Sequence, residues 1–314
     1  MPVATALRSI DLTPFERYRP LIDDWTAFVD ALRRPLPTCV WANPLRTTPE
    51  MLVTRLRDHG FDPMPLSWLS HAFCLPADVD IGRQLAYVAG MLHVQEEVSL
   101  LPVPLLDPRP GERVLDLCAA PGNKTAQIAT RMRNRGTVVA NDISYGRVAS
   151  MRSTLDRLGI ANVSATTYDA ANYPSESGAF DRVLADVPCS CEGTSRKQPS
   201  VVAQREAMRD PTGAQRAILR QAVRRCRPGG RVVYSTCTYA PEENEAIIDA
   251  VLRDVGPEAL RLRPARIDGV MGSPGLTTWQ GQSFHPSLAN ALRVWPHQND
   301  TGGFFIAVLE KANA

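Results

Sequence analysis

The stretch VLDLCAAPGNKT, residues 114–125, carries the strongest fold signal in this chain. A short apolar run, typical of a buried strand, turns through small residues into a segment that predicts a helix. The same alternation continues downstream and predicts a mostly parallel sheet with helices on both faces. The expected strands are residues 113–118, 136–141, 163–167, 182–187, 231–235 and 304–309, and the expected helices are residues 124–132, 145–158, 214–226 and 242–255.

The first 85 residues follow a different pattern. Short strands are expected at residues 39–43 and 66–75, with a helix between them that Thr48 caps, that has Pro49 at its first position and that ends at Gly60. We therefore predict two domains, which are a small N-terminal α+β module over residues 1–85 and an α/β domain over residues 86–314. A polar insertion at residues 188–212 interrupts the second domain, and long loops of this kind are often functional.

The composition is that of an ordinary globular protein, with 44% hydrophobic and 22% charged residues among 314. No apolar run is long enough to span a membrane, and the N-terminus lacks the apolar core of a signal peptide. Seven cysteines, an odd number without a regular framework, indicate reduced thiols, so we expect a cytoplasmic protein. Five scattered histidines and the lack of a C-x-x-C pair predict that no metal is bound.

The charge of the whole chain, only +2, does not indicate a nucleic-acid partner. Arginines at helical spacing form a stripe, for which a solvated helix face is the simpler interpretation; they are Arg216, Arg220 and Arg224. Lysine is rare, and two of the three lysines, Lys124 and Lys197, lie inside the segments that carry the candidate chemistry. This distribution suggests that an ammonium group is required at both places.

The turn at residues 118–124 is a candidate nucleoside site. It has neither the G-x-G-x-x-G spacing of a dinucleotide site nor the spacing of a P-loop. Asp142 follows Gly122 by 20 residues (142 − 122), where an acidic side chain accepts hydrogen bonds from ribose hydroxyls. Ribose without pyrophosphate favours S-adenosylmethionine, and the alternative is a plain strand–turn–helix with a capping aspartate. The predicted cofactor-binding residues are Cys118, Ala119, Ala120, Pro121, Gly122, Asn123, Lys124, Asp142, Arg147, Asp169 and Asp186.

Two further segments each place a cysteine just beyond a predicted strand. Cys189 follows Asp186 in DVPCS, and Cys237 follows a strand in STCT. Because the carboxyl ends of parallel strands meet at one edge of the sheet, both cysteines are expected beside the cofactor turn. A thiolate there would attack an electron-poor ring. The alternative for Cys237 is a small buried hydrophobic residue, and spacing alone does not assign the two roles.

Four segments occur in the order seen in the Nol1/Nop2/Sun family of RNA cytosine-C5 methyltransferases. The chain resembles this family from about residue 90 to residue 311, through VLDLCAAPGNKT, NDIS (residues 141–144), DVPCSCEGTSRK (residues 186–197) and YSTCTYAPEENE (residues 234–245). The resemblance implies a Rossmann-like class I methyltransferase fold, with a seven-stranded, mostly parallel sheet. It also implies methyl transfer from S-adenosylmethionine to C5 of a cytosine in rRNA or tRNA.

The resemblance also assigns roles to individual residues. Cys237 would be the nucleophile that bonds to C6, Cys189 would assist product release, and Asp186 would contact N3 or N4 of the base. Lys124 would lie on the cofactor side or beside the base. Cys191 departs from the family pattern, which usually has glycine there, and either alters the loop or offers a third thiol.

RNA is the partner that the resemblance implies, and we expect a monomer. The chain ends soon after the last expected strand, so RNA contacts are expected from the module at residues 1–85 and from the insertion. Arg196 and Lys197 are the candidates for phosphate contacts. One alternative is an N- or O-methyltransferase on the same fold, for which the thiols would be superfluous. Another is a non-catalytic RNA-binding assembly factor, for which loss of Cys237 would be expected.

Overall fold

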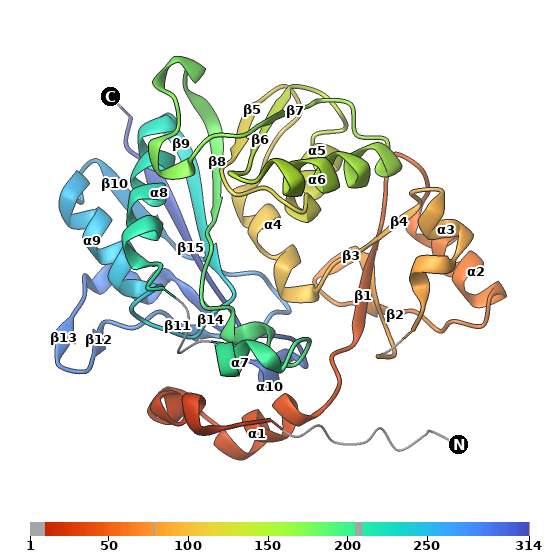
Figure 1. Cartoon of the computed structure of the whole chain (residues 1–314), viewed down its shortest axis with the longest axis horizontal. Helices are drawn as coiled ribbons and strands as arrows, with labels where there is room; N and C mark the ends of the chain where they lie inside the picture. Colours follow the sequence, from red (N-terminus) through yellow and green to blue (C-terminus); the bar gives the residue numbers. More distant parts are fainter. Residues whose placement is uncertain (1–9, 78, 205–208, 314) are drawn as a thin grey trace.

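A central nine-stranded sheet forms the frame of the molecule (Figure 1). The computed structural model describes residues 10–77, 79–204 and 209–313. Five strands run parallel in the order β9-β8-β5-β6-β7, and β15 lies antiparallel beside β9. The alternation in the sequence therefore predicted the parallel sheet correctly. The bounds are β5 Arg113–Asp116, β6 Thr137–Asn141, β7 Val163–Thr166, β8 Phe180–Asp186, β9 Cys226–Thr236 and β15 Phe304–Lys311.

The sheet has nine strands where seven were predicted. Both β10 (Leu260–Arg263) and β14 (Leu292–Val294) pair with β15, and β11 (Ser273–Pro274) pairs with β14. Strands of two or three residues are too short to produce a periodic pattern, so β11 and β14 escape prediction. A separate hairpin is formed by β12 (Thr278–Trp279) and β13 (Gln282–Ser283).

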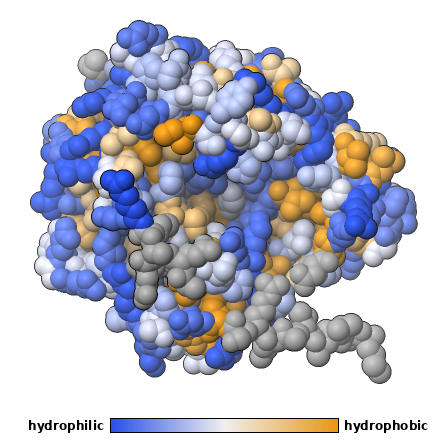
Figure 2. Space-filling view, viewed as in Figure 1, coloured by the Kyte–Doolittle hydropathy of each residue, from blue (hydrophilic) through white to orange (hydrophobic). Residues whose placement is uncertain are grey.

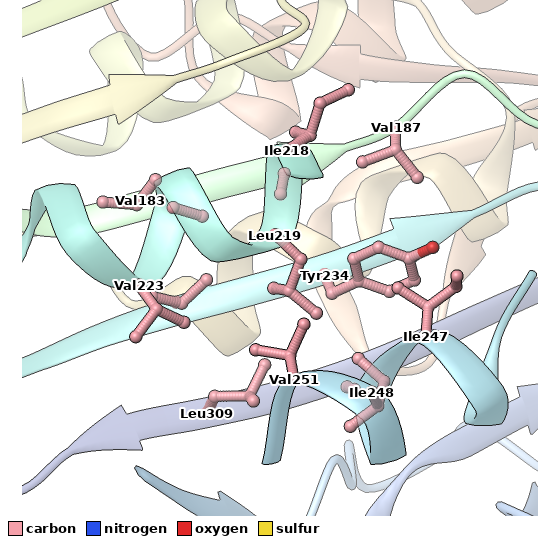
Figure 3. Packing of buried hydrophobic residues seen from close by; sticks show 14 of the residues in the cluster. Val183, Val187, Ile218, Leu219, Val223, Tyr234, Ile247, Ile248, Val251 and Leu309 are labelled. Carbon is pink, nitrogen blue, oxygen red and sulfur yellow. The ribbon is translucent and has the colours of Figure 1, made fainter. Parts of the chain in front are cut away.

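Helices cover both faces of this sheet. On one face, α8 and α9 pack on strand residues that include Val183 and Leu309 (Figure 3). On the other face, α4 and α5 pack on residues that include Val114 and Leu184. Neighbours such as Val183 and Leu184 point to opposite faces, as expected for a parallel sheet between two helical layers. The helices are α4 Pro102–Leu106, α5 Asn123–Arg131, α6 Tyr145–Leu158, α7 Ser200–Gln204, α8 Thr212–Arg225, α9 Glu245–Val255 and α10 Pro296–Asn299.

A second, antiparallel sheet has the strand order β2-β3-β1-β4. Thr48 caps the helix beside it, as predicted. The strand predicted at residues 66–75 is confirmed as β3 over Leu69–Leu75, whereas Leu66 ends the preceding strand, β2, because the chain turns back between Leu66 and Leu69. The sheet also extends beyond residue 85, since β4 pairs with β1. The elements are β1 Thr38–Ala42, α2 Pro49–Asp58, β2 Met64–Leu66, β3 Leu69–Leu75, α3 Leu85–Val88 and β4 Leu92–Val94.

The described part of the N-terminus before β1 packs on the larger domain. It consists of the 3-10 helix η1 (Thr13–Leu21) and α1 (Trp25–Arg33). Phe28 of α1 lies against Tyr239 and Trp295, with ring centroids 5.8 and 6.1 Å away. The sequence pattern did not predict this packing, because the partners lie more than 200 residues away in the chain.

The insertion contains α7 and the short η6 (Glu192–Thr194), while residues 205–208 of it lie outside the described residues. Other 3-10 helices are η2 Ile81–Arg83, η3 Glu97–Leu100, η4 Ala170–Asn172, η5 Ser175–Ser177 and η8 Pro286–Asn290. None of the described helices has the length and apolar character needed to cross a membrane. The face drawn in Figure 2 is largely hydrophilic, with scattered hydrophobic patches.

Candidate active site

Two neighbouring parallel strands bring the cysteine segments to one place. Asp186, at the end of β8, is level with Ser235 of β9. Ser235 donates a hydrogen bond of 2.6 Å to the Asp186 carboxylate. Beyond these residues each loop adds a cysteine, and the Sγ atoms of Cys189 and Cys237 lie 3.3 Å apart. The structure thus brings together the two thiols that the sequence placed at one sheet edge.

A third thiol belongs to the same cluster. Cys191 Sγ lies 4.0 Å from Cys189 Sγ, and the three sulfurs lie within 4.8 Å of one another. Cys191 has a φ of +58°, in the left-handed region that favours glycine. Cys189 is buried, whereas Cys191 and Cys237 are half-buried. Of the two alternatives that the sequence left open for Cys191, an altered loop or a third thiol, the structure shows that its sulfur joins the cluster.

Contacts among the three sulfurs set their acidity. Hydrogen bonds from the Cys189 and Cys237 thiols lower the pKa of Cys191 to about 3. Hydrogen bonds to Cys191 and Cys237, together with burial, raise the pKa of Cys189 well above its ordinary value. The hydrogen bond with Cys189 lowers the pKa of Cys237, but the bond to Cys191, burial and nearby negative charge raise it more. A raised pKa favours the protonated form of the Cys237 thiol.

Lys124, in the first turn of α5, connects three segments at Asp186. Its Nζ donates hydrogen bonds to Asp186 Oδ2 at 2.8 Å and to Ser99 Oγ at 2.9 Å. Burial lowers the pKa of Lys124, but the Asp186 carboxylate raises it more, so the ammonium stays charged. Both carboxylate oxygens of Asp186 are thus hydrogen-bonded, one by Ser235 and one by Lys124. Lys124 can therefore donate a proton to a nucleobase ring that binds against Asp186.

A small pocket of about 40 Å³ opens between the turn after β5 and Asp186. Asp116 at its base is a site residue that the sequence interpretation missed. Burial raises the pKa of Asp116 to about 7. Thr125 donates a 2.7 Å hydrogen bond to Oδ2, while Oδ1 has no partner among the described residues. An acidic residue inside the apolar strand VLDLC was the available signal. The lining residues are Asp116, Cys118, Ala119, Ala120, Pro121, Asn123, Lys124 and Asp186.

Gly122 allows the turn to adopt its shape. It has a φ of +101°, and a Cβ there would lie 2.8 Å from Met151 Cγ. A side chain would therefore be strained and would also collide with α6. Since Gly122 immediately precedes α5, glycine lets the start of this helix approach the pocket.

Asp142 and Arg147 support the same turn from the end of β6. Asp142 is buried and accepts hydrogen bonds from the backbone N–H groups of Ala120 at 3.3 Å and Ser144 at 3.0 Å. Arg147 lies 3.3 Å from the Asp142 carboxylate and donates a 2.6 Å hydrogen bond to the Ala120 carbonyl. Both predicted residues therefore contact the cofactor turn directly.

Asp169 lies beyond the end of β7, where it is exposed and caps η4. Two large apolar side chains near these strand ends are also exposed, Ile143 by 70% and Tyr168 by 49%. Exposed apolar groups beside Asp142 and Asp169 form a surface suited to a flat, partly apolar ring. The sequence interpretation identified the two aspartates but not these neighbours.

Of the two predicted phosphate contacts, only Lys197 lies at the surface. The buried Arg196 donates hydrogen bonds to the carbonyls of Pro35 at 3.0 Å and Thr301 at 2.8 Å, and pairs with Asp300 at 2.8 Å. The prediction that Arg196 binds phosphate is therefore wrong. Its guanidinium joins the insertion to two distant chain segments and has no exposed surface to offer.

Buried polar contacts hold the loop that carries Cys237. Arg293 of β14 forms a bidentate ion pair with Glu245, and their side chains are 3% and 0% exposed. Arg293 also donates a 2.9 Å hydrogen bond to the Tyr239 carbonyl. The hydroxyls of Ser190 and Thr238 lie 2.6 Å apart and join the two cysteine loops. These contacts hold the backbone of the loops that carry the sulfurs.

The strand order and the strand-edge site define a class I methyltransferase fold. The family model for the 16S rRNA methyltransferase RsmB/F matches residues 103–310. The chain is 36% identical to the mouse 28S rRNA (cytosine-C(5))-methyltransferase, over 90% of this chain and 36% of that protein. It is 33% identical to the ribosomal RNA small subunit methyltransferase F of Escherichia coli, over 96% of this chain and 63% of that protein. A crystal structure of a methyltransferase homolog from Pyrococcus horikoshii has a TM-score of 0.78 and 34% identity, covering 91% of this chain and 90% of that one.

The chain belongs to the RsmB/F family, within the Nol1/Nop2/Sun group that the sequence segments indicated. The class I methyltransferase fold implied by the resemblance is thereby confirmed. The chain spans between about a third and two thirds of the length of these curated relatives.

Proposed function

We propose that this protein transfers a methyl group from S-adenosylmethionine to C5 of a cytosine in ribosomal RNA. The observation that carries the proposal is the pair of thiols, 3.3 Å apart, beside Asp186 and the cofactor pocket. Methyl transfer to a nitrogen or an oxygen has no use for two thiols at that place. The names of the mouse and E. coli relatives support ribosomal RNA as the substrate class.

The residues around the pocket fit S-adenosylmethionine, which supplies an electrophilic methyl group when bound. The unpaired Oδ1 of Asp116 is an acceptor for its amino group. Asp142 is the acceptor for its ribose hydroxyls, with Arg147 holding that carboxylate in place. Asp169 and the exposed Ile143 would flank its base.

The two thiols, Asp186 and Lys124 have separate roles in the proposed reaction. Cys237, once deprotonated, adds to C6 of the cytosine, and this addition makes C5 nucleophilic. Negative charge develops toward N3, where Asp186 and the Lys124 ammonium stabilise it or supply a proton. After C5 is methylated, Cys189, once it has lost its own thiol proton, accepts the C5 proton as a thiolate, and the bond between Cys237 and C6 breaks to restore the aromatic ring.

RNA must present the cytosine outside a helix for these groups to reach it. Lys197 lies on the rim of a pocket of about 220 Å³ between the insertion and the second sheet, which Gln95 and Glu96 also line. This location makes Lys197 our remaining candidate for a phosphate contact. The second sheet, on the other side of the pocket, is the part of the N-terminal module best placed to meet RNA.

The test uses ribosomal RNA transcripts, S-adenosylmethionine and a denaturing gel. Cys237→Ala should neither methylate nor form an adduct, whereas Cys189→Ala should accumulate a covalent protein–RNA complex because release is slow. Cys74→Ser, outside the thiol cluster, serves as the control that retains activity. Nucleoside analysis of the RNA should find 5-methylcytosine. N- or O-methylated products, full activity of Cys237→Ala, or modification of tRNA in place of rRNA would each contradict the proposal.

A further inference from the structure

The three sulfurs at the sheet edge have the separations of a metal site. A tetrahedral Zn²⁺ with Zn–S bonds of about 2.3 Å holds its sulfurs about 3.8 Å apart. The separations of 3.3 and 4.0 Å from Cys189 lie on either side of that value, and the third separation is below 4.8 Å. Side-chain rotations that move the sulfurs by no more than about 1 Å would let one cation contact all three sulfurs.

The backbone that carries these sulfurs is fixed before any ligand arrives. The Gly193 N–H donates a 2.9 Å hydrogen bond to the Cys237 carbonyl, and the hydroxyls of Ser190 and Thr238 meet across the two loops. Little ordering would therefore be required when a cation binds, and this favours affinity.

Cys191 has no part in the methyl transfer proposed above, yet its backbone has a strained, left-handed conformation. An L-residue with φ near +58° is strained, and glycine would avoid the strain. Backbone strain that persists beside a functional site points to a use for the side chain. The Cys191 side chain projects its sulfur toward Cys189, where it completes a set of three.

We propose that Cys189, Cys191 and Cys237 bind a thiophilic divalent cation, with Zn²⁺ the natural candidate. Binding forms three metal–sulfur bonds, releases to solvent the protons of those cysteines that are still thiols, and leaves a fourth position to water. Three thiolates and one Zn²⁺ carry a net charge of −1, and the nearby Lys124 ammonium, which also pairs with Asp186, lowers the electrostatic cost of that charge.

The bound cation would switch the site off. Its bonds take the Cys237 lone pair needed for attack and the Cys189 sulfur needed to accept a proton, so zinc binding and RNA methylation exclude each other. Cation binding is independent of the proposed function, whereas the block on methylation rests on it.

The test titrates Cd²⁺ into the reduced protein without oxygen and follows the ultraviolet sulfur-to-cadmium band, with Zn²⁺ as competitor. One Cd²⁺ per chain is expected. Cys191→Gly, which relieves the backbone strain and so should fold, is expected to weaken binding by at least ~10–100-fold, because loss even of an outer-shell partner costs that much. Cys191→Ser, which keeps the size of the side chain, should weaken binding similarly.

Cys74→Ser is the matched control, because Cys74 faces Cys39 in another thiol pair, close to Glu97. Cadmium binding that is lost in Cys74→Ser but kept in Cys191→Gly would overturn the proposal, as would no binding at all. Zn²⁺ should inhibit methylation by the wild-type protein, reversibly with chelator, and inhibit Cys191→Gly only at much higher concentration. If the zinc-loaded protein methylates normally, the switch is refuted. If the metal-free protein methylates no RNA, the proposed function fails while the cadmium result stands.

Discussion

Replacing Arg293 with methionine should show how strongly the protein holds the loop that carries Cys237. Methionine keeps much of the apolar stem but removes the guanidinium. Glu245, whose side chain has no exposed surface, then loses its bidentate partner, and the Tyr239 carbonyl loses its 2.9 Å donor. Removing one partner of a buried ion pair costs about 3–5 kcal/mol, because the remaining charge stays buried without compensation. We expect this loss in the free energy of unfolding.

Urea denaturation at pH 7 measures the loss, and Trp295 provides a local signal because its ring stacks on Tyr239 with centroids 5.1 Å apart. A thermal scan should show a Tm lower by on the order of 10 °C. Adding Glu245→Gln to Arg293→Met removes the uncompensated charge while it keeps an acceptor for the Leu276 N–H at 3.0 Å. The double variant should therefore recover at least half of the lost stability. A cost below about 1 kcal/mol for Arg293→Met, or a double variant no more stable than the single one, would refute the reasoning.

Three further results are expected. The pKa of Asp116, raised to about 7, means that the folded state binds a proton more tightly than the unfolded state, so the free energy of unfolding should fall by on the order of 4 kcal/mol between pH 4 and pH 7 and then level off. In a series of urea denaturations, Asp116→Asn should flatten this part of the pH profile, and an unchanged profile would contradict the assignment. Gly122→Ala should weaken S-adenosylmethionine binding in calorimetry, because its Cβ meets Met151 and strains the turn by about 1–3 kcal/mol; an unaltered affinity would show that the turn tolerates a side chain. Lys197→Glu should raise the apparent KM for RNA and reduce the slope of the salt dependence by roughly one, with cofactor affinity unchanged; Arg224→Glu on the exposed face of α8 is the control, and an equal effect there would place the RNA path elsewhere.

Local pattern was enough to predict the frame of this molecule. A strand buried on both faces of a parallel sheet is a short continuous apolar run, so the strand at Val114 and the turn that leads into the helix after Gly122 were both visible in the sequence. The site followed from one topological rule, because parallel neighbours β8 and β9 must end at the same edge. This rule brought Cys189 and Cys237 together across 48 residues.

What the pattern missed depends on contacts between distant segments. Arg196 lies in a polar insertion and looked exposed, but the carbonyls that bury it come from Pro35 and Thr301. The aromatic residues of η1 and α1 have no helical period that indicates their partner. Asp116 was overlooked because its role depends on surroundings that the sequence does not show. These are its complete burial, which raises its pKa, and the hydrogen bond that it accepts from Thr125.

The packing of α1 on Tyr239 and Trp295 also has a consequence for the order of synthesis. Asp23 and His297, which meet at this interface, are separated by 274 residues, so a ribosome takes roughly 15–55 s between them. During that interval Phe15, Tyr18 and Phe28 have no completed surface to cover them and are a natural target for chaperones. A nascent chain that stops short of Trp295 already contains the three clustered cysteines, Cys189, Cys191 and Cys237. It lacks Trp295, on which α1 packs. The packing of α1 can therefore be completed only after Trp295 has been synthesised, and a product truncated before Trp295 should lack it.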